Sequence, residues 1–143
     1  MSKIDWLTQE IIKEYKAGNA ERRVLLQTIK AALLTRQKEK GELVEADELS
    51  VIKSELKQRQ QARSDYENGG RADLVEKMDY EITELKQLLP EEMGEGEVRK
   101  VVQEVVESSQ DKSFGNIMKE SMVRLKGQAD GQLVSSIVKE LLG

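Results

Sequence analysis

Apolar side chains recur along the first ninety residues at intervals of three and four, which is the spacing of one face of a helix. This pattern predicts helices over residues 3–17, 20–40 and 46–68, and a fourth helix that ends before Pro90. Because only Gly69-Gly70 and Arg71 separate the last two, they are expected to form a long antiparallel hairpin. The inward positions are Ile4, Leu7, Ile11 and Tyr15, then Leu25, Leu26, Ile29, Leu33 and Leu34, then Leu49, Ile52 and Leu56, and finally Leu74, Met78, Ile82, Leu85 and Leu89.

The pattern breaks directly after Pro90, where residues 91–97 are acidic and contain two glycines. This composition predicts a linker between an N-terminal four-helix domain, residues 1–90, and a C-terminal domain, residues 98–143. Three further apolar stripes predict that the second domain is a three-helix tail. They are Val98, Val101, Val102, Val105 and Val106, then Phe114, Ile117, Met118, Ser121, Met122 and Leu125, and then Leu133, Val134, Ile137, Val138, Leu141 and Leu142. The predicted fold class is therefore all-α.

The short segment Lys126-Gly127-Gln128-Ala129-Asp130-Gly131 connects the last two predicted helices. Gly127 is predicted to end the first of them in the left-handed conformation, which glycine adopts without steric cost. Asp130 is predicted to begin the second, with its carboxylate accepting from the amide of Gln132 or Leu133. We call residues 126–131 the tail corner.

The composition excludes several classes of function. The chain has no histidine and no cysteine, so it lacks the usual general base, thiol chemistry and the commonest metal ligands. No apolar run has the length of a membrane span, and we expect a cytoplasmic protein without metal or cofactor. Trp6 falls opposite the inward face of the first helix, and we expect it to pack under a neighbouring helix or loop.

The net charge of −4 means that any nucleic-acid surface must be a local patch. From Lys112 onward cations outnumber acids, and the candidate contacts there are Lys112, Lys119, Arg124, Lys126, Gly127, Gln128 and Gly131. A secondary basic patch along the hairpin comprises Lys53, Lys57, Arg59, Arg63 and Arg71. From the residues alone, RNA binding and ordinary solvated surface charge are equally well supported. No candidate catalytic residue emerges.

Four segments, in this order, resemble the YqeY-like family over essentially the whole chain: Glu55-Leu56-Lys57-Gln58-Arg59, Gly69-Gly70-Arg71-Ala72-Asp73-Leu74, Leu88-Leu89-Pro90-Glu91, and the tail corner with Leu133-Val134. That family is related to the C-terminal helical and tail region of GatB, one of the proteins that make up the glutamine-dependent aminoacyl-tRNA amidotransferase. The resemblance implies an all-helical, two-part protein and a role linked to tRNA. It does not imply amide transfer, because the catalytic machinery of that relative lies in a separate domain.

The leading hypothesis is a non-catalytic module that binds tRNA, or an enzyme that handles tRNA, through the tail corner. The first alternative is a protein-interaction adaptor without RNA binding, which would use the hairpin tip or Trp6 and the tail. The second is a part of a carbon–nitrogen ligase system that uses glutamine as amido donor.

Overall fold

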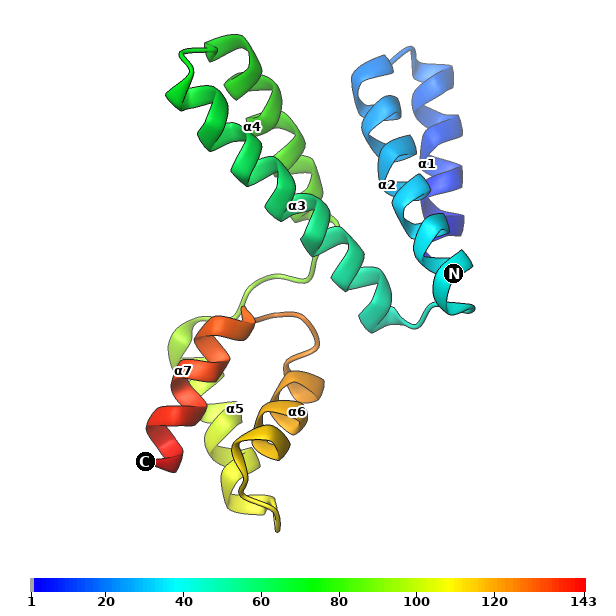
Figure 1. Ribbon diagram of the computed structural model, residues 1–143. Coiled ribbons are helices and arrows are strands. Elements are labelled where there is room, and N and C mark those ends of the chain that lie inside the picture. The colour runs from blue at the N-terminus through cyan, green and yellow to red at the C-terminus, as the bar shows by residue number, and fades with distance from the viewer. Residues whose placement is uncertain (1) are drawn as a thin grey trace. The chain divides into compact units, whose positions relative to one another are not determined.

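Seven helices account for most of the residues described in the computed structural model, which are residues 2–143 (Figure 1). They are α1 (Lys3–Ala17), α2 (Ala20–Lys40), α3 (Glu45–Asn68), α4 (Ala72–Gln87), α5 (Glu95–Ser108), α6 (Phe114–Leu125) and α7 (Gly131–Leu142). The predicted all-α fold is confirmed, because these residues form helices and their connections and no strand. The chain divides into two compact units, the first ending at Leu88 and the second spanning Leu89–Gly143.

Two helical hairpins, α1–α2 and α3–α4, make up the first unit (Figure 1). Local signals set the first hairpin. Ser2 Oγ accepts from the amide of Asp5 at the start of α1, and Gly18 ends this helix at φ 76°. Asn19 then accepts from the amide of Arg22 to begin α2. The buried apolar core comprises Leu7, Leu25, Leu26, Ile29, Leu33, Leu49, Val51, Ile52, Met78 and Leu85.

Two side chains that periodicity placed inward are exposed instead. Tyr15 is 70% exposed and lies in the last turn of α1, where its ring packs 5.6 Å from the guanidinium carbon of Arg23. Leu34 is 38% exposed. Side chains at the margin of a helix's apolar stripe stay in solvent where no neighbouring helix covers them.

The second unit is a three-helix bundle. Its buried residues are Val98, Val102 and Val105 from α5, Ile117 and Leu125 from α6, Ala129 from the tail corner, and Val134, Ile137 and Val138 from α7. The five valines therefore form a helix, although valine by itself favours strands. Phe114, predicted inward, is 42% exposed and lies beneath the ammonium of Lys139 at 5.9 Å.

The segment predicted as a linker is partly built into the second unit. Glu95, Gly96 and Glu97 form the first turn of α5, where acidic side chains are favoured by the helix dipole. Met93 packs against the core of this unit. The helix α5 thus begins three residues before the predicted domain start at residue 98, because a glycine-containing acidic stretch can also begin a helix.

Candidate nucleic-acid interface

The backbone turns at the tail corner in two left-handed residues. Lys126 has φ 47° and ψ 44°, and Gly127 has φ 80°. Gly127 is thus left-handed as predicted, but the helix ends one residue earlier, with Lys126 as its C-cap. Lys126 is the one non-glycine residue with positive φ among residues 2–143. For such a side chain the left-handed region costs about 1–2 kcal/mol.

Three contacts hold this turn in place. The amide of Gln128 donates to the carbonyl of Leu125 at 2.9 Å, and the carbonyl of Gln128 accepts from the amide of Met93 at 2.7 Å. The side chain of Ala129 enters the core and is 4% exposed. The backbone of Gln128 is therefore occupied by the fold, and only its side chain is left to meet a ligand.

The start of α7 lacks the side-chain cap that the sequence predicts. Asp130 has the extended backbone of an N-cap residue, and its carbonyl accepts from the amide of Val134 at 3.1 Å. Its carboxylate, however, makes no capping hydrogen bond. The first-turn amides of α7 therefore keep their donors without a carboxylate partner. Above Gly131 there is open space, since a β-carbon there would meet no atom within 4 Å.

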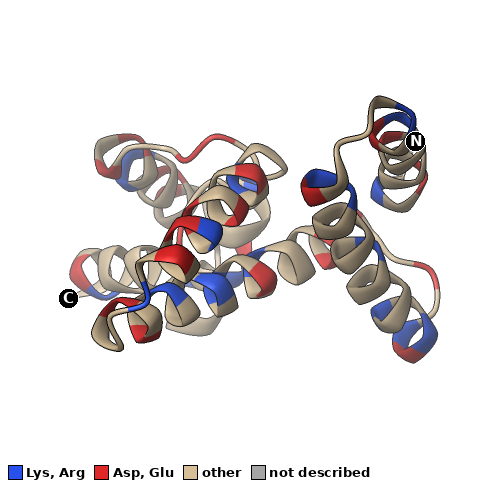
Figure 2. Cartoon of the chain, turned by 90° about the horizontal axis from the view of Figure 1, so that it is seen from above, with Lys and Arg blue, Asp and Glu red and all other residues tan. Residues whose placement is uncertain are grey.

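Two exposed lysines lie at this end of the tail, Lys119 within α6 and Lys126 at its C-cap. They are separated by nearly two helical turns, a rise of about 10 Å. Between them lies Val123, 68% exposed. In the part of the chain that the structure describes, neither ammonium makes an ion pair or a hydrogen bond. Figure 2 shows cations and acids spread over both units. Lys40 is the only lysine with an ionic partner among residues 2–143, so what sets Lys126 apart from the other lysines is its backbone conformation, not its free charge.

The other two cations predicted for this region are engaged within the fold. Arg124 pairs with Glu104 of α5 at 2.7 Å, and both side chains are about half exposed, at 46% and 47%. The ammonium of Lys112 donates to the carbonyl of Val106 near the end of α5. Lys112 also precedes α6, whereas the tail corner follows it, so the helix separates them by about 18 Å. The predicted patch is therefore divided, and only its corner end combines Lys119, Lys126 and Gly131.

Three of the five cations in the secondary basic patch form ion pairs within the fold. Arg59 pairs with Glu81 of α4 at 2.9 Å and with Glu55 of α3 at 3.2 Å. Arg63 pairs with Asp79 of α4 and with Glu67 at 2.8 Å.

At the turn of the same hairpin, Arg71 pairs with Asp73 at 3.2 Å and holds the pKa of that carboxyl below its ordinary value of 3.8. Only Lys53 and Lys57 of this patch have no ionic partner among residues 2–143. Arg59 and Arg63 each link α3 to α4, and the sequence alone does not reveal this role because Glu81 and Asp79 lie on the other helix.

Other kinds of site leave little trace in residues 2–143. No group of three or more acidic side chains there is arranged to hold a metal ion. None of the described helices combines the length and apolarity needed to cross a membrane.

The described chain is thus an all-helical protein of two units, with an exposed cationic corner in its three-helix tail. It belongs to the family of YqeY-like proteins, whose sequence profile matches residues 4–142. No curated protein matches the chain.

Proposed function

We propose that this protein is a non-catalytic module that binds tRNA through the tail corner, with Lys119 and Lys126 as the main phosphate contacts. The observation that carries the proposal is the conformation of Lys126. A lysine occupies a left-handed position that glycine would fill at lower cost, and its ammonium is exposed and has no partner among residues 2–143. Backbone strain of this kind is concentrated at functional positions, which favours a role for the side chain.

Phosphate contacts suit the remaining chemistry of the corner. The open space above Gly131 lets a sugar–phosphate backbone approach the first-turn amides of α7. The carboxylate of Asp130 opposes an anion there, so the amides assist and the lysines carry the contact. Arg124 joins by exchanging Glu104 for a phosphate, since an exposed ion pair contributes less than about 1 kcal/mol.

Counterion release makes the proposal measurable. Each phosphate neutralised by a cation adds about 0.7–0.9 to the slope of log K against log salt. We expect total tRNA to bind at low salt, and the double variant Lys119→Gln with Lys126→Gln to bind with a slope smaller by about 1.5. The matched control is Lys13→Gln with Lys16→Gln, which removes two exposed lysines of α1 that have no ionic partner in residues 2–143.

An unchanged slope in the corner variant, or an equal loss in the control, would contradict the proposal. A loss confined to Lys53→Gln with Lys57→Gln would move the contact to the hairpin.

A protein-interaction adaptor is the second candidate, and the exposed apolar side chain of Val123 favours it. It predicts that a protein partner is captured after nuclease treatment, and that Val123→Ser weakens the capture while both lysine substitutions do not. A role in glutamine-dependent amide transfer predicts product formation by the isolated chain, and we expect none.

A further inference from the structure

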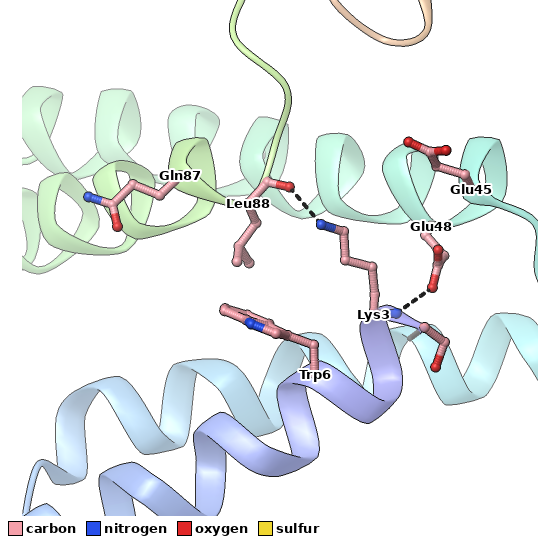
Figure 3. A pocket seen from close by; sticks show the side chains of 7 residues that line it. Lys3, Trp6, Glu45, Glu48, Gln87 and Leu88 are labelled. Atoms are coloured by element: carbon pink, nitrogen blue, oxygen red, sulfur yellow. Dashed lines mark hydrogen bonds between the residues drawn. The ribbon is translucent and has the colours of Figure 1, made fainter.

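An open pocket of about 470 Å³ lies in the first unit, where the ends of three helices meet (Figure 3). Its lining residues come from the start of α1, the start of α3 and the end of α4, and they are Ser2, Lys3, Trp6, Glu45, Glu48, Gln87 and Leu88. The volume is in the range of small-molecule sites. The indole of Trp6 extends from α1 towards Leu88 and lines the pocket (Figure 3).

One carboxylate in the pocket is buried and only half used. Glu48 is 9% exposed, and its Oε2 accepts from the backbone amide of Lys3 at 2.8 Å. The second oxygen, Oε1, receives no hydrogen bond from residues 2–143. This oxygen is not fully buried, so it is open to the pocket and available to a group that enters it.

The charges around this oxygen favour a cation. Glu45 and Glu48 supply two carboxylates, while Lys3 supplies one ammonium. That ammonium is turned towards the carbonyl of Leu88 at the long distance of 3.4 Å, where the end of α4 adds partial negative charge. The amide of Lys3 at the start of α1 is already satisfied by Glu48, so it does not attract an anion. The ionisable side chains that line the pocket therefore include one more carboxylate than ammonium, and they lie beside the indole of Trp6.

We propose that this pocket binds an organic cation, an alkylammonium or guanidinium group, with its charge at Glu45 and Glu48 and its methylene groups against Trp6. The indole of Trp6 gives the methylene groups an apolar surface while the carboxylates receive the charge. The cation is supplied either by a free small amine or by a lysine or arginine side chain of a protein. The proposal is independent of RNA binding, because it involves only residues of the first unit.

Trp6 is the only tryptophan of the chain, so its fluorescence reports directly on the pocket. The intact protein is titrated with n-butylammonium chloride, with n-butanol as the neutral control, and with sodium chloride at matched ionic strength. We expect a saturable change with butylammonium at roughly millimolar concentration, which is usual for a fragment of this size. N-acetyl-lysine methylamide distinguishes the sources: tighter binding than butylammonium indicates a protein side chain, and weaker binding a free amine.

Two substitutions should act in opposite directions. Glu45→Gln should weaken butylammonium binding about two- to fivefold, the effect of one exposed ion pair. Lys3→Met should strengthen it by a similar factor, because it removes the competing ammonium and keeps the backbone amide that caps Glu48. Glu42→Gln, which changes an exposed acid outside the pocket, serves as the matched control and should leave the affinity unchanged.

Several results would overturn the proposal: no saturable change, a response to butanol as steep as that to butylammonium, or affinities that Glu45→Gln and Lys3→Met leave equal to the native value. Far-UV circular dichroism of each variant shows whether the fold is retained. If Glu45→Gln fails to fold, the Lys3→Met result decides alone.

Discussion

Replacing Lys126 separates the cost of its backbone conformation from the benefit of its charge. In Lys126→Gly both the left-handed strain and the ammonium are lost, whereas Lys126→Ala loses only the ammonium and keeps the strain. The strain amounts to about 1–2 kcal/mol for a residue with a β-carbon. Part of this gain is lost in the glycine variant, because glycine makes the unfolded chain more flexible and this lowers the free energy of unfolding by roughly 0.5–1 kcal/mol. The glycine variant should therefore be about 0.5–1 kcal/mol more stable than the alanine variant.

The two variants should nevertheless bind tRNA equally weakly. Loss of one phosphate contact removes about 0.7–0.9 from the salt slope, which corresponds to a five- to eightfold loss of affinity at about 0.1 M salt. Lys126→Arg keeps the charge and should retain both the native slope and the strain.

The assay must report on the second unit alone. All tyrosines and the tryptophan lie before Leu89, so fluorescence follows only the first unit. Amide hydrogen exchange at Val102 and Ile137, two buried residues of the bundle, measures the free energy of opening of the second unit. Trp6 fluorescence in urea then serves as an internal control that should not change.

Equal protection in the glycine and alanine variants would refute the strain argument. Weakened binding in alanine but not in glycine would show that the charge of Lys126 is not what RNA recognises.

Three further predictions concern the interior and the ion pairs. Ser121 is fully buried and its hydroxyl has no hydrogen-bond partner among the described residues, so Ser121→Ala should stabilise the second unit by about 1 kcal/mol in hydrogen exchange. Arg59→Gln should lower the urea stability of the first unit by about 2 kcal/mol, because it leaves Glu81 unpaired, and should leave the tRNA salt slope unchanged. Lys40 and the amide of Val44 hold the pKa of Asp47 below its ordinary value of 3.8. The Asp47 carboxylate therefore stabilises the fold above pH 3.8 and progressively less as the pH falls below that value. The difference in stability between the native chain and Asp47→Asn should shrink as the pH is lowered below 3.8.

The parts of the fold that the sequence predicts correctly are those set by local rules, namely helix capping and apolar spacing. The ends of α1 and α2 follow from Gly18, Asn19 and apolar spacing, all within a few residues of the place they determine. The same rules do not show that Met93 packs against the core of the second unit, because that core is formed mainly by residues after it in the chain. They also assign the left-handed conformation to Gly127 alone, whereas Lys126 adopts it as well. The local rules do not take into account that Ala129 is buried in the core two residues later.

The sequence identifies the cationic residues of the candidate site but not which of them are neutralised by ion pairs in the fold. Arg63 and Lys126 look alike in the sequence, as cations near a glycine-containing turn. The register of the α3–α4 hairpin brings Asp79 against Arg63, whereas no acidic side chain in residues 2–143 reaches Lys126. Pairing between helices is set by register, which sequence spacing within one helix does not contain.

The presence or absence of an ion pair also determines how much each basic residue is expected to contribute to RNA binding. An arginine that already has two carboxylates must lose them before it meets a phosphate, so its net gain is small, and its removal costs stability as well. A lysine without a partner loses only water and counterions, so its full electrostatic attraction is available for binding. By this reasoning Lys119 and Lys126 should contribute more to the salt dependence than the paired arginines of the hairpin. Lys53 and Lys57 also lack an ionic partner among residues 2–143, so their double variant is the necessary comparison. Removal of Arg59 should act almost entirely through folding.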